Sequence, residues 1–255
     1  MGLKITLIGS GNMATNLANA FDQAGHTINQ VVSRNTVTAK ELASKYGAYY
    51  GTKLSELYND SNFILLCVND ESIAEVVSEL PNGLKGIICH TSGAVAMDVL
   101  NQYPGQYGVF YPLQSLTKAN VKSLMNVPVF IEWSDETTKL AIRNLADSIS
   151  NKVRETSSED RLKYHLAAVF ANNFTNLMYS IADNYLTANK LDFENLIPII
   201  EETASRLKLA KSDKLQTGPA KRGDKKIIEK HLEMLENNEL KEIYSKLSNF
   251  IMTNS

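Results

Sequence analysis

A glycine-rich turn near the start of the chain has the spacing of a loop that binds phosphate. Residues 9–14 spell GSGNMA, which matches G-x-G-x-x-A between an apolar run and a helical pattern. Here Gly9 permits a tight turn, Gly11 lets backbone N–H groups approach a phosphate, and Ala14 keeps the helix close to the strand. The alternative is a tight strand-to-helix turn without a ligand. We expect a dinucleotide pyrophosphate to bind at Gly9, Ser10, Gly11, Asn12, Met13 and Ala14, on the unpaired N–H groups of the helix start.

The residues after the second predicted strand indicate which dinucleotide binds. An NAD site usually carries Asp or Glu there, where the carboxylate bonds the ribose 2′-hydroxyl. This chain has Ser33, Arg34 and Asn35 instead. A guanidinium and a hydroxyl suit a 2′-phosphate. The pattern therefore predicts NADP(H) rather than NAD, with an ordinary solvated arginine as the alternative.

Further polar clusters follow other predicted strands. They are Val68-Asn69-Asp70, His90-Thr91-Ser92-Gly93 and Tyr111–Ser115. Because ligands of open α/β sheets sit beyond the carboxyl ends of the strands, we expect these clusters to line one cleft. Each has a structural alternative: Asp70 can cap a helix, Ser92 can form a turn, and His90 can be a hydrogen-bonded core histidine.

A helical pattern over residues 158–189 supplies a second polar surface. At 100° per residue, Asn172 and Asn176 lie within about 20° of His165, and apolar side chains occupy the opposite side. We expect His165 and Asn172 or Asn173 to bind a substrate carboxylate or carbonyl, or to transfer a proton. A stripe packed in a dimer interface or facing water is the alternative.

The elements that position these residues fall into two parts. Over residues 1–155, short β-rich runs alternate with amphipathic helical patterns, which predicts βαβ units and a mostly parallel sheet. From Glu159 onward the periodicity is helical only. The fold class predicted is α/β, with a Rossmann doubly wound domain at 1–155 followed by an all-helical domain at 156–255.

Composition limits the possible partners. The 255 residues are 44% hydrophobic with a net charge of −2, so no basic field predicts nucleic acid or an anionic membrane. No apolar run approaches the ~18 residues that a membrane span needs. The two cysteines lie in separate apolar runs, which favours buried thiols over a disulfide or a metal site. We expect no signal peptide, a cytoplasmic location and no metal.

With these motifs in place, the chain resembles a family of Rossmann-like bacterial NADP oxidoreductases. The family is related to pyrroline-5-carboxylate reductase, 6-phosphogluconate dehydrogenase and the deazaflavin-dependent NADP reductases. The resemblance extends over nearly the whole chain and is carried by IGSGNMA, VVSRN, CVND, HTSGA, YPLQSLT, HLAAVFANNFTN and TGPAKRGD. One departure is Tyr111, which stands where the family has histidine.

The resemblance implies a site and an assembly. It places NADP(H) on 9–14, 33–35 and Val68-Asn69. It places a small-molecule substrate near Ser92, His165 and Asn172 or Asn173, and it implies a homodimer formed through the helical domain.

We expect an NADPH-dependent reductase that acts on a C=O or C=N bond of a small anionic substrate. A 2-keto acid such as ketopantoate is the first expectation and a cyclic imine the second. His165 is the expected proton donor and His90 the reserve. A non-catalytic NADP(H)-binding sensor or scaffold is the alternative from another class.

Overall fold

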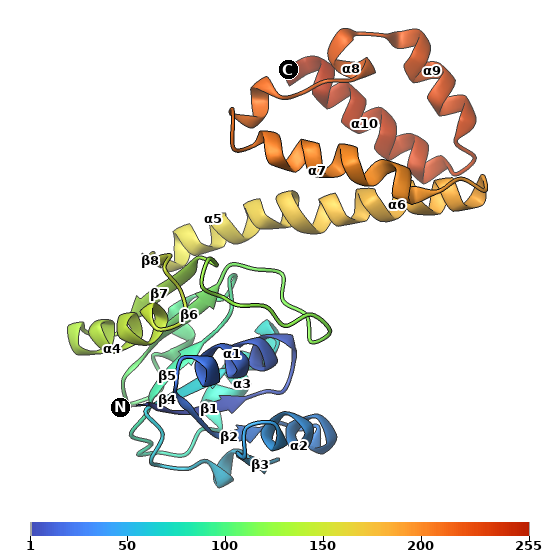
Figure 1. Ribbon diagram of the computed structural model, residues 1–255. Helices are drawn as coiled ribbons and strands as arrows, with labels where there is room; N and C mark the ends of the chain where they lie inside the picture. Colours follow the sequence, from blue (N-terminus) through green and yellow to red (C-terminus); the bar gives the residue numbers. More distant parts are fainter. Residues whose placement is uncertain (1, 255) are drawn as a thin grey trace. The chain divides into compact units, whose positions relative to one another are not determined.

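The computed structural model describes residues 2–254 and contains one eight-stranded sheet (Figure 1). The strand order is β3-β2-β1-β4-β5-β6-β7-β8. Neighbouring strands are parallel except β6 and β7, which are antiparallel. The strands are β1 Lys4–Ile8, β2 Thr27–Val32, β3 Tyr49–Gly51, β4 Phe63–Leu66, β5 Ile87–His90, β6 Tyr107–Pro112, β7 Val129–Trp133 and β8 Val153–Glu155. The predicted α/β class and mostly parallel sheet are confirmed.

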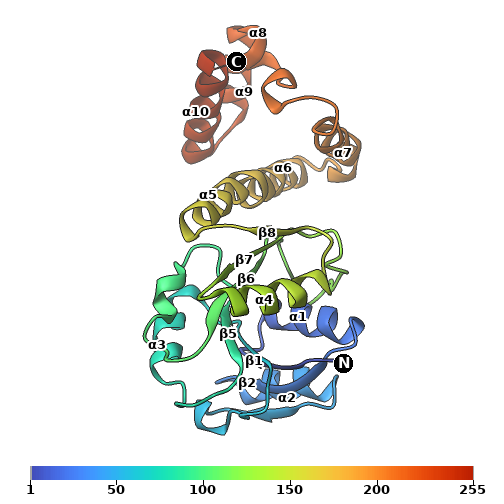
Figure 2. The same ribbon diagram turned by 90° about the vertical axis from the view of Figure 1, so that its left-hand side faces the viewer.

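Helices cover both faces of the sheet (Figure 2). The helices of this part are α1 Asn12–Gln23, α2 Thr36–Ser44, α3 Ile73–Ser78, α4 Glu136–Asp147 and α5 Ser158–Ala168, with short 3₁₀ turns at η1 Leu54–Glu56, η2 Asp70–Ser72 and η3 Met97–Leu100. One core joins α1, α2 and α4 to the sheet, and a second joins α3 and η3 to the other face. The structure is thus doubly wound, as the alternating pattern predicts.

The central strand β4 shows why its sequence does not alternate. Phe63 and Leu65 pack into the core beneath α1 and α2, whereas Ile64 and Leu66 pack into the core beneath α3. Successive side chains of a strand point to opposite faces, so a strand covered on both faces must be apolar throughout.

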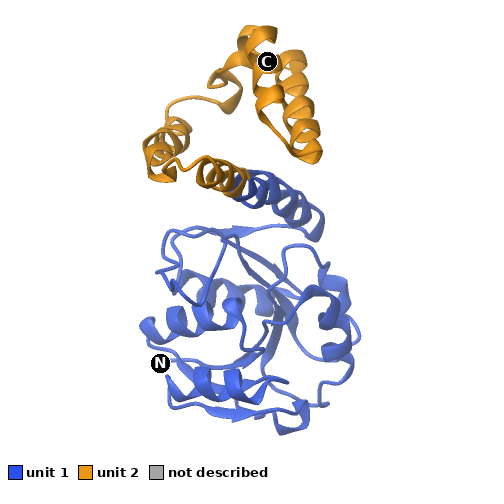
Figure 3. Ribbon diagram, turned by 90° about the vertical axis from the view of Figure 1, so that its right-hand side faces the viewer, with its two compact units in different colours: residues 1–177 blue, residues 178–255 orange. Residues whose placement is uncertain are grey.

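The chain divides into two compact units, residues 1–177 and 178–255 (Figure 3). Among the described residues after Glu155, up to residue 254, the regular elements are helices. In the second unit they are the rest of α6 Thr175–Ala188, η5 Phe193–Leu196, α7 Ile197–Arg206, η6 Ser212–Lys214, α8 Pro219–Arg222, α9 Lys225–Met234 and α10 Asn238–Asn254. The domain boundary at 155/156 stays a prediction. Across residues 2–254, no helix has the length and apolar character needed to cross a membrane.

Among the elements that the sequence did not predict are two short strands and one π-helical turn. Strands β3 and β8 each have three residues, too few for a periodic signal, and they exist because they pair with β2 and β7. The third is a π-helical turn, η4 Val169–Phe174, between α5 and α6. A π turn widens the helix locally, and such turns are frequent at functional sites.

A buried arginine fastens α5 to the sheet. The side chain of Arg161 is fully buried and pairs with Glu132 of β7. Its Nε also donates to the carbonyl of Ser92 at 3.1 Å, and Nη2 donates to the carbonyl of Val95. Ser158, the first residue of α5, donates to Glu132 Oε2 at 2.7 Å. Burial lowers the pKa of Arg161 to about 10, so the guanidinium remains charged at neutral pH.

Removing one partner of this ion pair should destabilise the first unit. Arg161→Met or Glu132→Gln leaves the other group buried without its counter-charge, which costs about 3–5 kcal/mol of unfolding free energy. Arg161→Met combined with Glu132→Leu should cost less than the sum of the single changes. Urea unfolding can follow Trp133, the single tryptophan, which is adjacent to Glu132 in β7. Single-variant losses below about 1 kcal/mol would contradict this role.

Candidate functional site

The glycine turn between β1 and α1 leaves bare backbone where a side chain would otherwise stand. Gly9 has φ +109°, and a Cβ there would lie 2.2 Å from the carbonyl oxygen of Cys67. A Cβ on Gly11 would meet no described atom within 4 Å, so the space beside Gly11 is open. Within residues 2–254, no side chain caps the start of α1. Its first N–H groups are therefore available to an anion.

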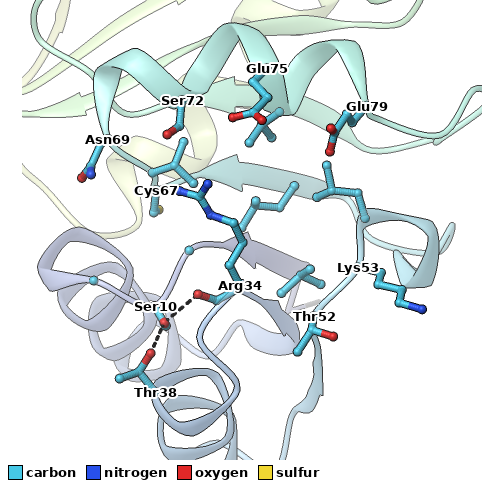
Figure 4. Close-up of a pocket in the computed structure, with 18 of the residues that line it drawn as sticks. Ser10, Arg34, Thr38, Thr52, Lys53, Cys67, Asn69, Ser72, Glu75 and Glu79 are labelled. Carbon is cyan, nitrogen blue, oxygen red and sulfur yellow. Dashed lines mark hydrogen bonds between the residues drawn. The ribbon is translucent and has the colours of Figure 1, made fainter.

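A cavity of about 610 Å³ opens beside this turn, within the size range of small-molecule sites. Figure 4 shows its two walls, with Ser10, Arg34 and Thr38 on one side and α3 on the other. Of the residues predicted to bind the cofactor, Gly9, Ser10, Gly11, Ser33, Arg34, Val68 and Asn69 line it. The sequence motifs at the ends of β1, β2 and β4 thus converge on one cavity.

The other four predicted cofactor residues have supporting positions. Asn12 is the first residue of α1, and Met13 is half-buried against the core. Ala14 is fully buried there, which is the close packing that the motif requires. Asn35 caps α2, because its Oδ1 accepts from the backbone N–H of Thr38 at 3.1 Å. None of the four is among the described residues that line the cavity.

Three hydroxyl groups cluster beside Arg34. Ser10 Oγ donates to Ser33 Oγ at 3.0 Å and lies 2.6 Å from Thr38 Oγ1 (Figure 4). The Arg34 side chain runs from the end of β2 across the cavity toward α3 (Figure 4). Hydroxyls and a guanidinium together supply the donors that a phosphate monoester needs. This group fits a 2′-phosphate.

Other charged residues of this cavity were missed by the sequence analysis. Lys53 and Lys118 add positive charge, whereas Glu75 of α3 and Glu79, the residue that follows α3, add negative charge (Figure 4 labels Lys53, Glu75 and Glu79). Glu75 and Glu79 are four residues apart on one helix, a spacing that could have been noticed. Lys118 could not, because only the folded loop brings it here.

A second cavity, of about 270 Å³, lies between β6 and the α5–η4 helix. It brings together the predicted residues His165, Asn172 and Asn173. The remaining lining residues are Tyr111, Leu113, Gln114, Ser115, Ala168 and Val169. Both asparagines lie in the π turn, and both line the cavity, whereas the helical wheel favoured Asn172 with Asn176.

His165 and Tyr111 form a pair in this second cavity. Tyr111 Oη lies 3.3 Å from His165 Nδ1. Gly93 packs so closely that a Cβ there would be 2.7 Å from Nδ1 and 2.8 Å from Oη. Burial and the negative charge of Asp70 raise the pKa of Tyr111, so its hydroxyl stays protonated at neutral pH. Tyr111 therefore supplies a hydrogen-bonding group at the position where the family resemblance implies histidine.

Ser92 and His90 are both buried, and neither lines a cavity described above. Ser92 Oγ accepts from the N–H groups of Ala94 and Val95, both at 3.0 Å, so it shapes a turn. His90 Nδ1 accepts from the Ser92 N–H at 3.2 Å. Burial, followed by the charge of Arg161, lowers the pKa of His90 to about 3. The ring is neutral at neutral pH, and neither residue belongs to the described lining of either cavity.

One loop contributes to both cavities. Leu113, Gln114 and Ser115 line the second cavity, and Lys118 lines the first. The sequence YPLQSLTK therefore runs from one site to the other along residues 111–118. A dinucleotide held at the first cavity and a small molecule held at the second would share this loop.

Comparison with known proteins is consistent with this geometry. The family model "NADP oxidoreductase coenzyme F420-dependent" matches residues 4–89, and the model "Domain of unknown function (DUF2520)" matches residues 127–251. No curated protein sequence matches the chain. The first model includes the glycine turn and Arg34, and the second includes His165 and the π turn.

A solved structure decides the family. The "putative NADP oxidoreductase BF3122" of Bacteroides fragilis is 37% identical, with a TM-score of 0.94 over 99% of this chain and 98% of that one. This chain belongs to the same NADP oxidoreductase family.

More distant members of the fold share the architecture of this NADP oxidoreductase family. The 1-pyrroline-5-carboxylate reductase of Streptococcus pyogenes is 16% identical, with a TM-score of 0.65 over 99% of each chain. A reductive aminase of Aspergillus terreus, solved with NADPH, is also 16% identical, with a TM-score of 0.65 over 82% of this chain and 76% of that one. At these identities the likeness concerns the fold.

Alanine at the two glycines should separate folding from binding. Gly9→Ala places a methyl group against Cys67 at a positive φ, so the melting temperature should fall and stability should drop by more than about 2 kcal/mol. Gly11→Ala has room for its methyl group, so the melting temperature should hold while NADPH affinity falls about tenfold or more. Thermal melts and a fluorescence titration measure both. Unchanged NADPH affinity in folded Gly11→Ala would contradict the assignment.

Proposed function

We propose that this protein is an NADPH-dependent reductase that acts on a C=O or C=N bond of a small anionic substrate. The observation that carries the proposal is the pairing of two cavities in residues 1–177. One has the glycine cradle and the 2′-phosphate donors, and the other has a histidine beside two asparagines. The shared loop of residues 111–118 supports their use in one reaction.

The cofactor fits the residues that are present. The N–H groups at the start of α1 would hold the pyrophosphate, and Ser33, Arg34 and Thr38 would hold the 2′-phosphate. When bound, NADPH supplies the hydride. The protein supplies position, hydrogen bonds and a proton.

His165 is suited to supply that proton. In the imidazolium form, Nδ1–H donates to Tyr111 Oη, which leaves the Nε2 proton as the one available for transfer. Burial lowers the pKa of His90 to about 3, so its ring is neutral, and His90 is not among the described residues that line the second cavity. Asn172 and Asn173 each carry an amide donor and an acceptor, so they can orient a carboxylate and the reacting oxygen or nitrogen.

Two substrate classes, one with a C=O bond and one with a C=N bond, fit the proposal. A 2-keto acid such as ketopantoate would present a carboxylate and a C=O group to this cavity. A cyclic imine is favoured by the relatives, since two of them are named as a pyrroline-carboxylate reductase and a reductive aminase. In both classes, His165 would supply the proton, and the amides of Asn172 and Asn173 would orient the substrate.

A substrate panel tests the function. NADPH oxidation should be measured with 2-keto acids and with cyclic imines, using the native protein and His165→Ala. The variant should lower kcat about 10²-fold or more and leave the NADPH dissociation constant unchanged. Asn176→Ala, one helical turn beyond Asn172 and outside the described cavity lining, is the control.

Two results would count against this function. Equal rates for native protein and His165→Ala would remove the histidine from the reaction. Binding of NADPH with no panel member reduced would favour the sensor or scaffold role.

A homodimer formed by the helical unit is part of the proposal. Within the described residues 178–254, Ala220 and Ile228 are the apolar residues that are buried. Many larger ones are exposed, including a stripe on α10 at Ile243, Leu247 and Phe250. A stable helical domain must cover such a stripe, and a second copy of the chain would do so.

Light scattering after gel filtration tests the assembly. The native protein should show twice the mass of one chain. Phe250→Glu puts a charge on the apolar stripe, where Phe250 is 68% exposed, and should shift the mass toward the monomer. Lys246→Glu, on the same helix with 80% side-chain exposure, should stay dimeric. A monomeric native protein would refute this assembly.

A further inference from the structure

The loop that follows β6 is fixed to the start of α1 by two asparagines. Asn12 Oδ1 accepts from the backbone N–H of Lys118 at 3.1 Å. Asn16 Nδ2 donates to the carbonyl of Thr117 at 3.0 Å and to the carbonyl of Asn12 at 2.9 Å. Leu116 packs against the core. Three consecutive loop residues, 116–118, are therefore each anchored.

Asn16 has few alternatives to this role. It is fully buried in the middle of α1, where the neighbouring Ala14, Leu17 and Ala18 are core residues. A buried amide must be hydrogen-bonded to be tolerated. Its Nδ2 donates to a carbonyl of its own helix and to a carbonyl of a loop 101 residues away in the chain, whereas its buried Oδ1 has no hydrogen-bond partner among the described residues. Burial of the Asn16 amide costs desolvation free energy, and the bond from Nδ2 to Thr117 fixes the loop of residues 116–118.

The anchored loop places Lys118 near the N-terminus of α1, where a positive charge by itself lowers stability. Lys118 lines the cavity at the end of α1 where the helix dipole is positive. A cation near a helix N-terminus is unfavourable by itself, whereas an anion there is stabilised. Gly11, the residue before α1, lines the same cavity and has open space beside it. Lys118 and the positive end of the α1 dipole together favour an anionic ligand at this edge of the cavity, whereas Glu75 and Glu79 lie on the α3 side.

We propose that Lys118 binds a phosphate of the dinucleotide, and that Asn12 and Asn16 act as positioning residues that hold it there. The inference rests on the proposed function, since the phosphate is that of NADP(H). It adds a phosphate-binding residue outside the glycine turn and explains why the turn is followed by asparagine at two positions one helical turn apart. Because the same loop carries Gln114 and Ser115 into the second cavity, the two asparagines also fix part of that site.

A double-mutant cycle tests the inference through NADPH binding alone. The dissociation constant is measured by NADPH fluorescence for the native chain, Lys118→Met, Asn12→Ala and the double variant. Lys118→Met should weaken binding about tenfold, the size of one charge-assisted contact. Asn12→Ala should weaken it less. The double variant should match Lys118→Met alone, because Asn12 acts through Lys118.

The loop offers a matched control. Lys122→Met removes the same charge from the same loop, and Lys122 is outside the described lining of the cavity. Its NADPH affinity should be native. Lys118→Arg should restore most of the affinity lost in Lys118→Met. Melting temperatures confirm that each variant is folded. Asn12 is replaced instead of Asn16 because Asn12 is exposed, so its loss disturbs the fold less than the loss of buried Asn16 would.

The outcomes separate this inference from the function on which it rests. Native protein that binds no NADPH would overturn both. Native binding with equal affinities for Lys118→Met and Lys122→Met would overturn the phosphate contact and leave the function standing. Losses from Lys118→Met and Asn12→Ala that add in full would overturn the positioning role, since a direct contact of Asn12 would then account for its effect.

Discussion

The close approach of two backbone segments at Gly9 is the constraint on which the cofactor site depends. Strand β1 must end and α1 must begin within a turn that passes the carbonyl of Cys67, where a Cβ would lie at 2.2 Å. Only glycine satisfies both that contact and a φ of +109°. The turn then directs the unpaired N–H groups of α1 toward the open space at Gly11. Polar residues at the ends of β2 and β4 meet there because parallel strands end on the same edge of the sheet.

A second set of interactions, centred on Arg161, forms the cavity that contains His165, Asn172 and Asn173. Arg161 joins α5 to Glu132 of β7 and to the loop after β5. One turn farther along the same helix, His165 meets Tyr111 of β6. The π turn that follows presents Asn172 and Asn173 to the same space. A single buried guanidinium thus positions the helix that carries all three polar residues, and the loop after β6 brings that cavity and the cofactor cavity together.

The sequence predicts the parts of this arrangement that are local. The glycine turn, the βαβ alternation and the absence of an acid after β2 are short patterns with direct physical meaning, and they led to the family and to NADP(H). Contacts between distant residues leave no such pattern. Tyr111 and His165 are 54 residues apart, and Asn12 and Lys118 are 106 apart. The wheel for residues 158–189 assumed 3.6 residues per turn, so it could not show that the π turn brings both Asn172 and Asn173 to the cavity.

Calorimetric titration with NADPH and with NADH is the most direct test of the central claim, that this backbone cradle and its neighbouring arginine hold NADP(H). The account predicts heat corresponding to one nucleotide per chain and an affinity for NADPH about tenfold or more above that for NADH. Arg34→Ala should remove most of that difference. Folded protein that gives no heat with either nucleotide, or that binds both equally before and after the Arg34 change, would contradict the account.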